Sequence, residues 1–531
     1  MWAVLQEPCD ENIIRSGRET APCSQARGRW ILAATILASS MAFIDGTVVN
    51  VALPALQTNL NATALDVQWV VEAYALLLSA LLLVGGSLGD HYGRRRIFLL
   101  GIAIFALASG ACGFAENIRQ LIVARAFQGL GAAFLVPGSL AIISNSFSEQ
   151  ERGRAIGTWS GFSAITAAIG PVLGGWLIEH VSWRAVFFIN LPLALLVILI
   201  SLRHIAENSD RESTRVDWLG AILAAVGLGA LVYGLIKSSQ VGFGDRSVMV
   251  VLTIAIAILI LFVVVESRLA QPMLPLKLFR SRTFAGTNLL TFLLYAALGG
   301  TLFFLPLNLI QVQHYSPTAA GAALLPFIII ISVLSRWSGG LVARYGAKLA
   351  LIAGPIIVAS GYLVFLLPGI GGNYWTTFFP PVVVLGLGMA ITVAPLTTTV
   401  MNSIAQNRAG IASGVNNAVA RTASLLAIAV LGVVMLHVFK GSLDRRLIAA
   451  NLPASATQSV QTQSTKLAAI DIPPHLDAGT QQVIRRAIDE SFVSGFRWVM
   501  AIGAALAAAS AVTAVVSIQP PARLSSGANA R

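Results

Sequence analysis

The most constraining feature of this sequence is a series of apolar runs, each about 20 residues long, that recur between short polar breaks. A run of that length crosses a hydrocarbon core of about 30 Å as an α-helix. Of the 531 residues, 56% are hydrophobic and 11% are charged, whereas an ordinary soluble domain carries about 25% charged residues. Because a water-soluble fold cannot bury so much apolar surface, the sequence predicts an all-α polytopic membrane protein.

Counting these runs gives 14 predicted transmembrane helices. The weakest evidence concerns the seventh and eighth helices, because only a short glycine-containing link separates them. An even number of spans places both ends of the chain on one side of the membrane. The spans are expected near residues 30–51, 68–88, 97–115, 120–143, 155–178, 184–202, 218–236, 248–266, 285–310, 318–341, 349–368, 374–398, 409–436 and 498–517.

The basic residues are distributed unevenly between the two sets of loops. Lys and Arg in short loops tend to remain in the cytoplasm. With the N-terminus inside, the predicted cytoplasmic segments hold 21 Lys and Arg residues, and the short outer loops hold four. The net charge of +12 therefore reflects topology, with attraction to anionic lipid headgroups as a secondary effect. The sequence predicts no nucleic-acid partner and places both termini in the cytoplasm.

Three segments outside the predicted spans complete this topology. Residues 1–29 form a polar cytoplasmic N-tail without an apolar core, so no cleavable signal peptide is expected before the first span. Residues 518–531 form the cytoplasmic C-tail. The long hydrophilic stretch 437–497 is expected outside the cell as a solvated loop, with a lid or a partner site as the alternative. Its second half, residues 481–496, has the pattern of an amphipathic helix on the membrane face.

Neither a metal nor a nucleotide cofactor is expected. The cysteines Cys9, Cys23 and Cys112 and the six scattered histidines do not have the spacing of a metal site or of a disulfide framework. No nucleotide-binding P-loop sequence occurs. An integral membrane enzyme would need paired catalytic groups or metal clusters, so the composition favours a transport protein.

Two loops of the sequence share one design. Residues 86–96 read Gly-Ser-Leu-Gly-Asp-His-Tyr-Gly-Arg-Arg-Arg and follow the second span, and residues 339–348 read Gly-Gly-Leu-Val-Ala-Arg-Tyr-Gly-Ala-Lys and follow the tenth. In both loops glycines permit tight turns and close helix contacts, and basic residues favour the cytoplasmic side. Many secondary transporters consist of repeated halves that rock about a site near the bilayer midplane. The chain is therefore interpreted as six spans, two central spans and six more.

The first of these loops resembles the cytoplasmic signature of the major facilitator superfamily. That signature reads Gly-x-Leu-Ala-Asp-Arg-x-Gly-Arg-Lys, and here Gly89 replaces its alanine and His91 stands where an arginine is usual. The second copy lacks the acid and has Ala343.

Three further segments carry the same resemblance. Residues 121–131 resemble the fourth-span motif, and residues 166–177 resemble the antiporter motif of the fifth span, with Thr166 in place of its first glycine. Residues 45–54 resemble the first-span motif of the fourteen-span drug/proton antiporters. The resemblance implies a major facilitator fold with six-helix halves at 30–203 and 285–517 and two linker helices at 217–266. It also leads us to expect a monomer.

Charged residues within the predicted spans are the candidates for coupling, because an unpaired charge in lipid costs several kcal/mol. Asp45 lies in the first span, where a buried carboxylate can bind a proton from either side in turn. Arg125 in the fourth span can neutralise that carboxylate, or another one, when it is deprotonated. The resemblance implies a proton-coupling role for both residues, and a fixed structural ion pair is the alternative for each.

A second group of residues suits substrate binding. Glu72 lies in the second span between Trp69 and Tyr74, and a carboxylate beside aromatic rings attracts organic cations. Asn50, which belongs to the first-span motif, is also expected to bind substrate. The alternative is that Glu72 lies near the outer end of its helix and contacts water.

Six residues are expected to take part in gating. Asp90, Gly93 and Arg94 belong to the first cytoplasmic loop, whose charges are expected to hold helix ends together in one state. Pro171 removes a backbone hydrogen bond in its helix, and Gly170 and Gly174 permit close packing. A topological role of the loop and a passive kink at the proline are the alternatives.

The resemblance implies a multi-pass protein of the cell (inner) membrane that exports small lipophilic compounds, including cationic drugs, in exchange for protons. The proton gradient would be the energy source, without a cofactor. A dedicated exporter of one metabolite or antibiotic would have the same fold and coupling residues. An importer and a non-transporting sensor are further alternatives, and the sensor would not need Asp45 and Arg125 inside the bilayer.

Overall fold

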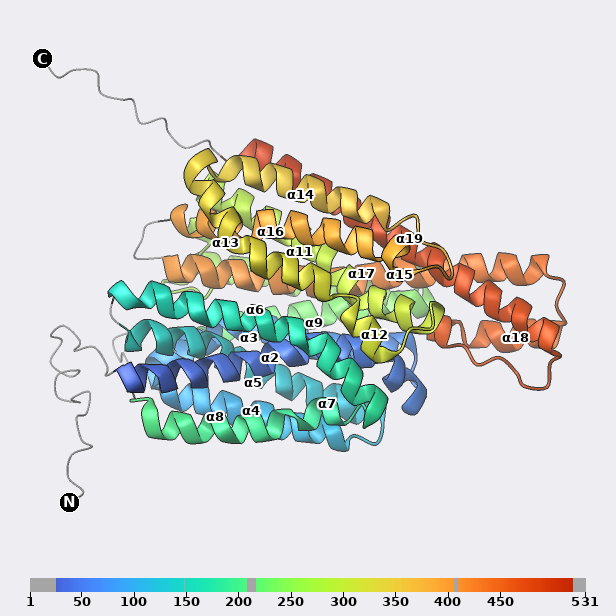
Figure 1. Ribbon diagram of the computed structural model, residues 1–531, viewed down its shortest axis with the longest axis horizontal. Helices are drawn as coiled ribbons and strands as arrows, with labels where there is room; N and C mark the ends of the chain where they lie inside the picture. Colours follow the sequence, from blue (N-terminus) through green and yellow to red (C-terminus); the bar gives the residue numbers. More distant parts are fainter. Residues whose placement is uncertain (1–24, 148, 208–215, 405–408, 519–531) are drawn as a thin grey trace, which may run out of the picture. The chain divides into compact units, whose positions relative to one another are not determined.

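The computed structural model describes residues 25–147, 149–207, 216–404 and 409–518. Within these ranges the chain is a set of helices joined by short connections, and none of the described residues lies in a strand (Figure 1). The all-α prediction is therefore confirmed. Most of the N-tail and nearly all of the C-tail lie outside the described residues.

The chain divides into two compact units. The first comprises residues 1–274 and 309–322, and the second comprises residues 275–308 and 323–531. The helices of the first unit are α2 (Gln25–Asn59), α3 (Ala64–Tyr92), α4 (Arg94–Phe114), α5 (Ile118–Ser146), α6 (Glu149–His180), α7 (Ala185–Phe188), α8 (Asn190–His204), α9 (Trp218–Val241), α10 (Arg246–Arg268) and α12 (Pro317–Ala322). Both predicted linker helices, α9 and α10, thus belong to the first unit.

The second unit contains the remaining helices. A short π-helix, η2 (Asn308–Val312), begins at the last residue before the chain passes to the first unit. The helices of the second unit are η1 (Leu276–Arg280), α11 (Arg282–Leu307), α13 (Leu325–Tyr345), α14 (Ala347–Val364), α15 (Tyr374–Thr377), α16 (Phe379–Asn402), α17 (Ala409–Ala449), α18 (Ala454–Thr462), η4 (Ser464–Ala469) and α19 (Ala478–Ser517).

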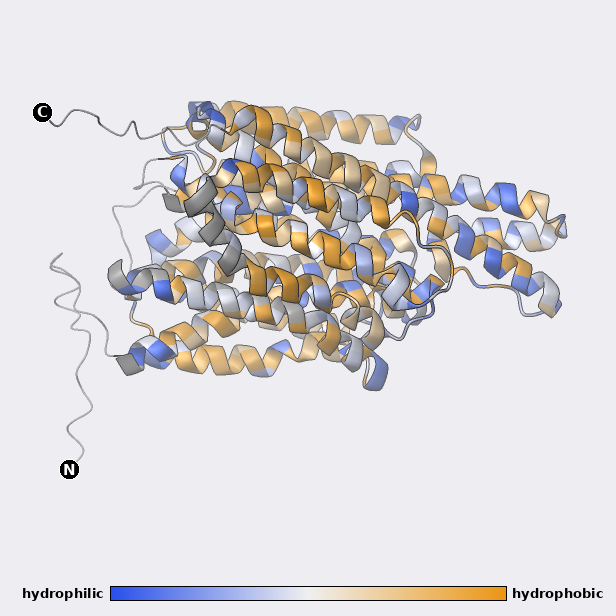
Figure 2. Cartoon of the chain, turned by 45° about the horizontal axis from the view of Figure 1, so that its top comes forward, coloured by the Kyte–Doolittle hydropathy of each residue, from blue (hydrophilic) through white to orange (hydrophobic). Residues whose placement is uncertain are grey.

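Among the described residues, 13 helices are long and apolar enough to cross a membrane. Apolar residues dominate the middle of these helices and polar residues gather towards their ends (Figure 2). The predicted span at 155–178 corresponds to α6, a helix of 32 residues that is not among the 13. A total of 14 spans is compatible with these helices and stays a prediction.

Local sequence signals explain where several helices begin. At the start of α3, the Thr63 side chain accepts a hydrogen bond from the Asp66 amide, and Asp66 in turn accepts from the Thr63 amide. Asp217 and Asp245 accept hydrogen bonds from the first-turn amides of α9 and α10. These contacts satisfy backbone donors that have no partner inside the helix.

The predicted span at 318–341 is not one continuous helix. The structure ends α12 at Ala322 and begins α13 at Leu325. Pro326 lacks an amide proton and occupies the first turn of α13, where none is needed. The apolar pattern alone missed this break, because the residues on either side of it are equally hydrophobic.

The two repeated loops share a backbone conformation. Gly93 connects α3 to α4 with φ of +112°, and Gly346 connects α13 to α14 with φ of +77°. Positive φ is accessible to glycine at little cost and is unfavourable for other residues. The shared design that the sequence predicted for these loops is therefore also present in their geometry.

The segment 437–497 is mostly helical and differs from the predicted loop. Helix α17 contains 41 residues and α19 contains 40, which corresponds to about 60 Å each, about twice a hydrocarbon core. Their extensions form a projection with α18 and η4 (Figure 1). Leu443, Val460, Ile484 and Phe492 are fully buried there. These buried apolar side chains, which come from α17, α18 and α19, explain why the segment folds, and residues 481–496 belong to α19.

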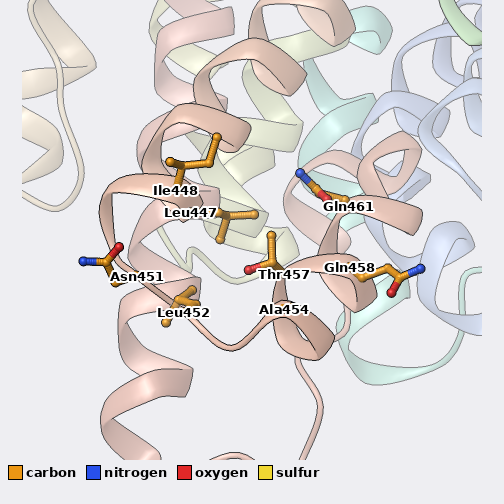
Figure 3. Close-up of a pocket in the computed structure, with 8 residues that line it drawn as sticks. All are labelled: Leu447, Ile448, Asn451, Leu452, Ala454, Thr457, Gln458 and Gln461. Carbon is orange, nitrogen blue, oxygen red and sulfur yellow. The ribbon is translucent and has the colours of Figure 1, made fainter.

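A cavity of about 540 Å³ lies on this projection, between the end of α17 and α18 (Figure 3). Leu447 and Leu452 contribute apolar surface, and Thr457 and Gln461 contribute polar groups. None of the residues that line it belongs to the predicted site.

Candidate functional site: a buried ion pair in the first unit

Asp45 on α2 and Arg125 on α5 form an ion pair in the interior of the first unit. Nη1 of Arg125 donates a hydrogen bond to Oδ2 of Asp45. Each residue is only 1% exposed. The structure therefore brings together the two residues that the sequence predicted as partners, and their role in proton coupling stays a prediction.

Gln128 completes the surroundings of this carboxylate. Its Nε2 donates to Oδ1 of Asp45 at 2.8 Å, and its Oε1 accepts from Nη1 of Arg125 at 2.7 Å. Nε of Arg125 donates to the Val70 carbonyl at 3.1 Å. Both oxygens of Asp45 thus have a donor, and the guanidinium is held from two sides.

Tyr74 lies against the same pair. The guanidinium of Arg125 lies 4.2 Å from the centroid of the Tyr74 ring, and the Tyr74 hydroxyl donates to the Ala42 carbonyl at 3.3 Å. A cation over an aromatic face is stabilised by the ring quadrupole. Tyr74, predicted as a substrate residue, therefore faces the ion pair.

Glycine contacts explain how α5 comes so close to α3. A Cβ atom at Gly129 would meet the backbone of Tyr74, including its carbonyl oxygen. Only a glycine permits that approach, which brings Arg125 within hydrogen-bond distance of a carbonyl on α3. Arg125 and Gln128 are three residues apart and so share one helix face.

Three buried polar residues that sequence reasoning missed extend this cluster. Ser109 on α4 accepts from Gln128 Nε2 at 3.2 Å, and Asn190 on α8 donates to Ser109 at 3.0 Å. Sγ of Cys112 lies 3.6 Å from Oε1 of Gln128. The sequence could have identified Gln128, because it lies three residues after Arg125 on the same helix face. Ser109, Asn190 and Cys112 are single small polar residues in apolar helices, and no sequence pattern marks them as part of a site.

Trp69 and Glu72 lie on a different side of α3. Trp69 packs near Tyr233 of α9, with ring centroids 6.4 Å apart. Leu76 contacts Gly229 of α9, and the 3.6-residue repeat places Glu72 on this same side. Glu72 is fully buried, and neither oxygen of its carboxyl group has a hydrogen-bond partner among the described residues. The structure thus groups Trp69 with Glu72 and separates Tyr74 from them.

Asn50 lies further along α2. Its side-chain amide donates to the Gly46 carbonyl at 3.4 Å, whereas its Oδ1 is buried without a hydrogen-bond partner. No contact with Glu72 or with the ion pair is recorded for it among the described residues. Its assignment to substrate binding stays a prediction.

The predicted gating loop contains an acid that the sequence analysis did not single out. Asp90 accepts from Nε of Arg94 at 2.8 Å. Glu207, after α8, accepts from the Arg95 amide at 3.1 Å, and a Cβ at Gly93 would meet its carboxylate at 2.5 Å. Glu207 therefore ties the end of α8 to the start of α4, and glycine leaves room for it.

The fifth-span motif packs against α2 beside the ion pair. A Cβ at Gly170 would meet Oγ1 of Thr47, and one at Gly174 would meet Val48 at 2.9 Å. A Cβ at Gly321 of α12 would likewise meet the backbone of Pro171. This motif therefore lies in close backbone contact with the part of α2 that carries Asp45.

The electrostatics of the pair determine what it can do chemically. In a dry interior two paired charges attract strongly, and removal of one partner costs about 3–5 kcal/mol, because the other charge stays buried alone. Protonation of Asp45 would leave the charge of Arg125 buried without a partner of opposite charge. A proton can therefore bind stably only if the helices that carry these residues also move.

Among the described residues, long apolar helices enclose a buried ion pair, an arrangement that is typical of membrane transporters. The family model of the Major Facilitator Superfamily matches residues 35–428. The chain therefore belongs to the major facilitator superfamily, as the four motifs predicted.

Curated relatives support this membership over most of the chain. The multidrug resistance protein Stp of Mycobacterium tuberculosis is 35% identical over 427 residues, which cover 78% of this chain and 77% of that protein. The tetracenomycin C resistance and export protein of Streptomyces glaucescens is 32% identical and covers 94% of both chains. The drug efflux pump JefA of M. tuberculosis is 30% identical over 90% of this chain and 95% of its own.

Solved structures resemble the fold at low sequence identity. A bacterial homologue of the human lysosomal transporter Spinster aligns with a TM-score of 0.63 and 17% identity, covering 94% of this chain and all of that one. The xylose transporter XylE from E. coli aligns with a TM-score of 0.54 and 13% identity, covering 93% and 97%. These likenesses concern the fold alone.

Proposed function

We propose that this protein exports small lipophilic compounds, including cationic drugs, across the cell membrane in exchange for protons. Both termini would lie in the cytoplasm, in agreement with the Lys and Arg asymmetry of the loops. The proton gradient would drive transport without a cofactor, and one chain would suffice.

The observation that carries this proposal is the buried pair of Asp45 and Arg125. Each oxygen of Asp45 accepts from a separate donor, so the ionised carboxylate is stabilised in this conformation. A proton from the outside would release Arg125 and change the packing of α2 against α5. Loss of that proton on the inside would restore the arrangement, which is the cycle that proton exchange requires.

The substrate class rests on the relatives and on Glu72. The names of the relatives describe multidrug resistance, tetracenomycin C export and drug efflux. Glu72 and Trp69 offer a carboxylate and an aromatic ring for a lipophilic cation. Because Glu72 is fully buried, a cation would reach it only after α9 moves away from α3.

Dedicated export of one natural product is the second candidate function. The tetracenomycin C export protein is similar over 94% of both chains, including the region that follows residue 428. A dedicated exporter would retain the ion pair but would not transport unrelated cations.

Ethidium efflux from cells that express the protein tests the proposal. We expect export of ethidium that a protonophore abolishes. Efflux that persists in the presence of the protonophore would contradict proton coupling. Absence of ethidium efflux from protein present in the membrane would favour the dedicated exporter.

The substitution Asp45→Asn tests the coupling residue itself. The amide cannot exchange a proton in this pH range, so we expect normal insertion and loss of protonophore-sensitive efflux. Asp471→Asn removes a carboxylate that pairs with Lys466 on the projection and serves as the control. Wild-type active export by Asp45→Asn would contradict the assignment of Asp45.

A further inference from the structure

Ser109 joins three elements through one hydroxyl group. This residue of α4 is fully buried. Its Oγ donates to the Phe187 carbonyl of α7 at 2.8 Å and accepts from Asn190 of α8 at 3.0 Å. It also accepts from Nε2 of Gln128 at 3.2 Å. All of these partners belong to the first unit.

The direction of these hydrogen bonds is fixed by proton count. A serine hydroxyl has one proton and two acceptor lone pairs. The proton is directed to the Phe187 carbonyl, because a carbonyl oxygen can only accept a hydrogen bond. Towards Gln128 the hydroxyl therefore presents a lone pair, and the side-chain amide of Gln128 must present its N–H group. If the Gln128 amide were flipped, its Oε1 would face the lone pair of the Ser109 Oγ, and two acceptors would meet without a proton between them.

This orientation determines what Gln128 offers to Asp45. With Nε2 next to Ser109, the second N–H points to Oδ1 of Asp45, and Oε1 points to Arg125. While Asp45 is ionised, Asp45 and Arg125 impose the same orientation. Once Asp45 takes up a proton, its carboxyl group no longer requires an N–H donor. Ser109 still requires one.

The geometry points to Ser109 as the positioning residue that keeps the Gln128 amide in this orientation whether or not Asp45 is protonated, so that its N–H group meets the carboxylate whenever α2 packs against α5 in this way. A donor held in place favours the ionised carboxylate over the protonated acid. Ser109 thereby sets the pH at which Asp45 releases its proton. This inference deepens the proposed function and rests on Asp45 as the proton-binding group.

The other charged and titratable groups near Asp45 are few. Arg125 comes from α5, Tyr74 from α3 and Cys112 from α4. Among the described residues, α7 and α12 contain no charged residue, and the basic residues of α8 lie in its last turn. On α6, the charged residues lie in the first turns, within residues 149–154, and at the end, at Glu179 and His180. Glu72 of α3 lies on the side of that helix that faces α9. None of these groups supplies the donor that Gln128 provides.

Infrared titration of the purified full-length protein in lipid nanodiscs tests the inference. The protonated Asp45 carboxyl band is assigned by its loss in Asp45→Asn and followed against pH. We expect Ser109→Ala to move the midpoint upward by about one pH unit, since the amide can then turn towards the protonated acid. Ser109→Thr retains a hydroxyl and should restore the wild-type midpoint.

Two further variants separate positioning from packing. Ser139 on α5 is also fully buried, and its hydroxyl donates only within its own helix, to the Leu135 carbonyl at 2.9 Å. Asn190→Ala removes a donor to Ser109 but leaves the lone pair that faces Gln128. We expect Ser139→Ala and Asn190→Ala to move the midpoint by less than about 0.3 unit.

An unchanged midpoint in Ser109→Ala, or the same shift in Ser139→Ala, would overturn the inference. The absence of any titrating Asp45 band in both the wild type and Ser109→Ala would also overturn it. The titration involves no transported compound. A Ser109-dependent midpoint together with protonophore-insensitive efflux would therefore contradict the proposed function and leave this inference standing.

Discussion

Two helix pairs, α4 with α5 in the first unit and α14 with α16 in the second, are built on the same backbone contact. A Cβ at Gly131 would meet the Gly101 carbonyl oxygen at 2.8 Å, and a Cβ at Gly388 would meet the Gly354 carbonyl oxygen at the same distance. In each pair a glycine on one helix faces a glycine on the other, so that the two backbones touch. The repeat predicted from two loops therefore extends into the helix packing.

The charges do not follow this repeat. Arg125 lies six residues before Gly131, and the residue six positions before Gly388 is Val382, which is 2% exposed. A buried contact of the second unit, between the hydroxyl groups of Thr301 and Tyr362 at 2.9 Å, joins two neutral side chains. No acidic residue occurs in the predicted spans of the second half.

This difference between the two units shows that helix packing and proton coupling place separate requirements on the sequence. Close packing of helices needs only small residues at matching positions, and both units have them. Proton coupling needs one ionisable pair in a dry environment, and a second copy would add a second desolvation cost. The first unit therefore holds the candidate chemistry, and the second shares its scaffold.

The largest expected effect comes from removal of one member of the pair. Arg125→Leu leaves Asp45 buried without its partner, so we expect a loss of about 3–5 kcal/mol in stability and no export. The double variant Asp45→Asn with Arg125→Leu should regain most of that stability without regaining export. Thermal unfolding in detergent and ethidium efflux measure the two effects.

Val382→Ala is the matched change in the second unit. It removes apolar volume from a buried site, so some stability is lost while export is retained. Equal destabilisation in Arg125→Leu and in the double variant would refute the uncompensated charge as the cause.

The next effect tests the shared scaffold. Gly131→Ala and Gly388→Ala each place a Cβ against a backbone atom, at 2.5 Å and 2.7 Å respectively. We expect each to cost about 1–3 kcal/mol, as overpacking does. A Cβ at Gly161 of α6 or at Gly441 of α17 would meet none of the described residues within 4 Å, so these two alanine variants should cost nothing. If only one of the two variants, Gly131→Ala or Gly388→Ala, lost stability, the two units would not share this packing contact.

The sequence predicted the parts of this molecule that depend on long, strong patterns. Apolar runs of about 20 residues located the helices, and the motifs located Asp45 and Arg125 as partners. The breaks at Ile189 and Ala323 were missed, because both lie within stretches that are apolar over most of their length. In the projection at 437–497, the helix over residues 481–496 was predicted, and the helices before it were missed because their apolar positions are diluted among polar ones.

The candidate site was predicted only in outline. Tyr74 and Trp69 are five residues apart, and helix geometry turns them to different sides of α3, which a cluster in sequence cannot show. Ser109 and Asn190 meet through tertiary packing across 81 positions. Such contacts depend on how the helices of the fold lie together, which one sequence does not show.

A smaller effect is expected from an ion pair of the second unit. Arg446 pairs with Glu490 on the projection, with side chains 39% and 28% exposed. Ion pairs in contact with water contribute about 0–1 kcal/mol, so Glu490→Gln should lower stability by no more than that and leave proton-coupled efflux intact. Loss of coupling in this variant would show that charges of both units take part.

The smallest effect concerns a helix cap. Asp477 accepts from the Thr480 amide at 2.9 Å at the start of α19. Hydrogen bonds from Thr480 lower the pKa of Asp477 below its ordinary value. A depressed pKa means that the stabilisation is present above the ordinary value, about pH 4, and is lost as the pH falls through the folded pKa. The protection of the first-turn amides of α19 against hydrogen exchange, relative to the intrinsic rate at each pH, should therefore fall on acidification in the wild type and much less in Asp477→Asn, whose side-chain oxygen still caps the helix. Export at neutral pH should be unchanged in that variant, since a charge that caps a helix has no part in proton exchange. A shifted pH profile of export would instead assign a coupling role to an acid of the second unit and remove the asymmetry between the two halves.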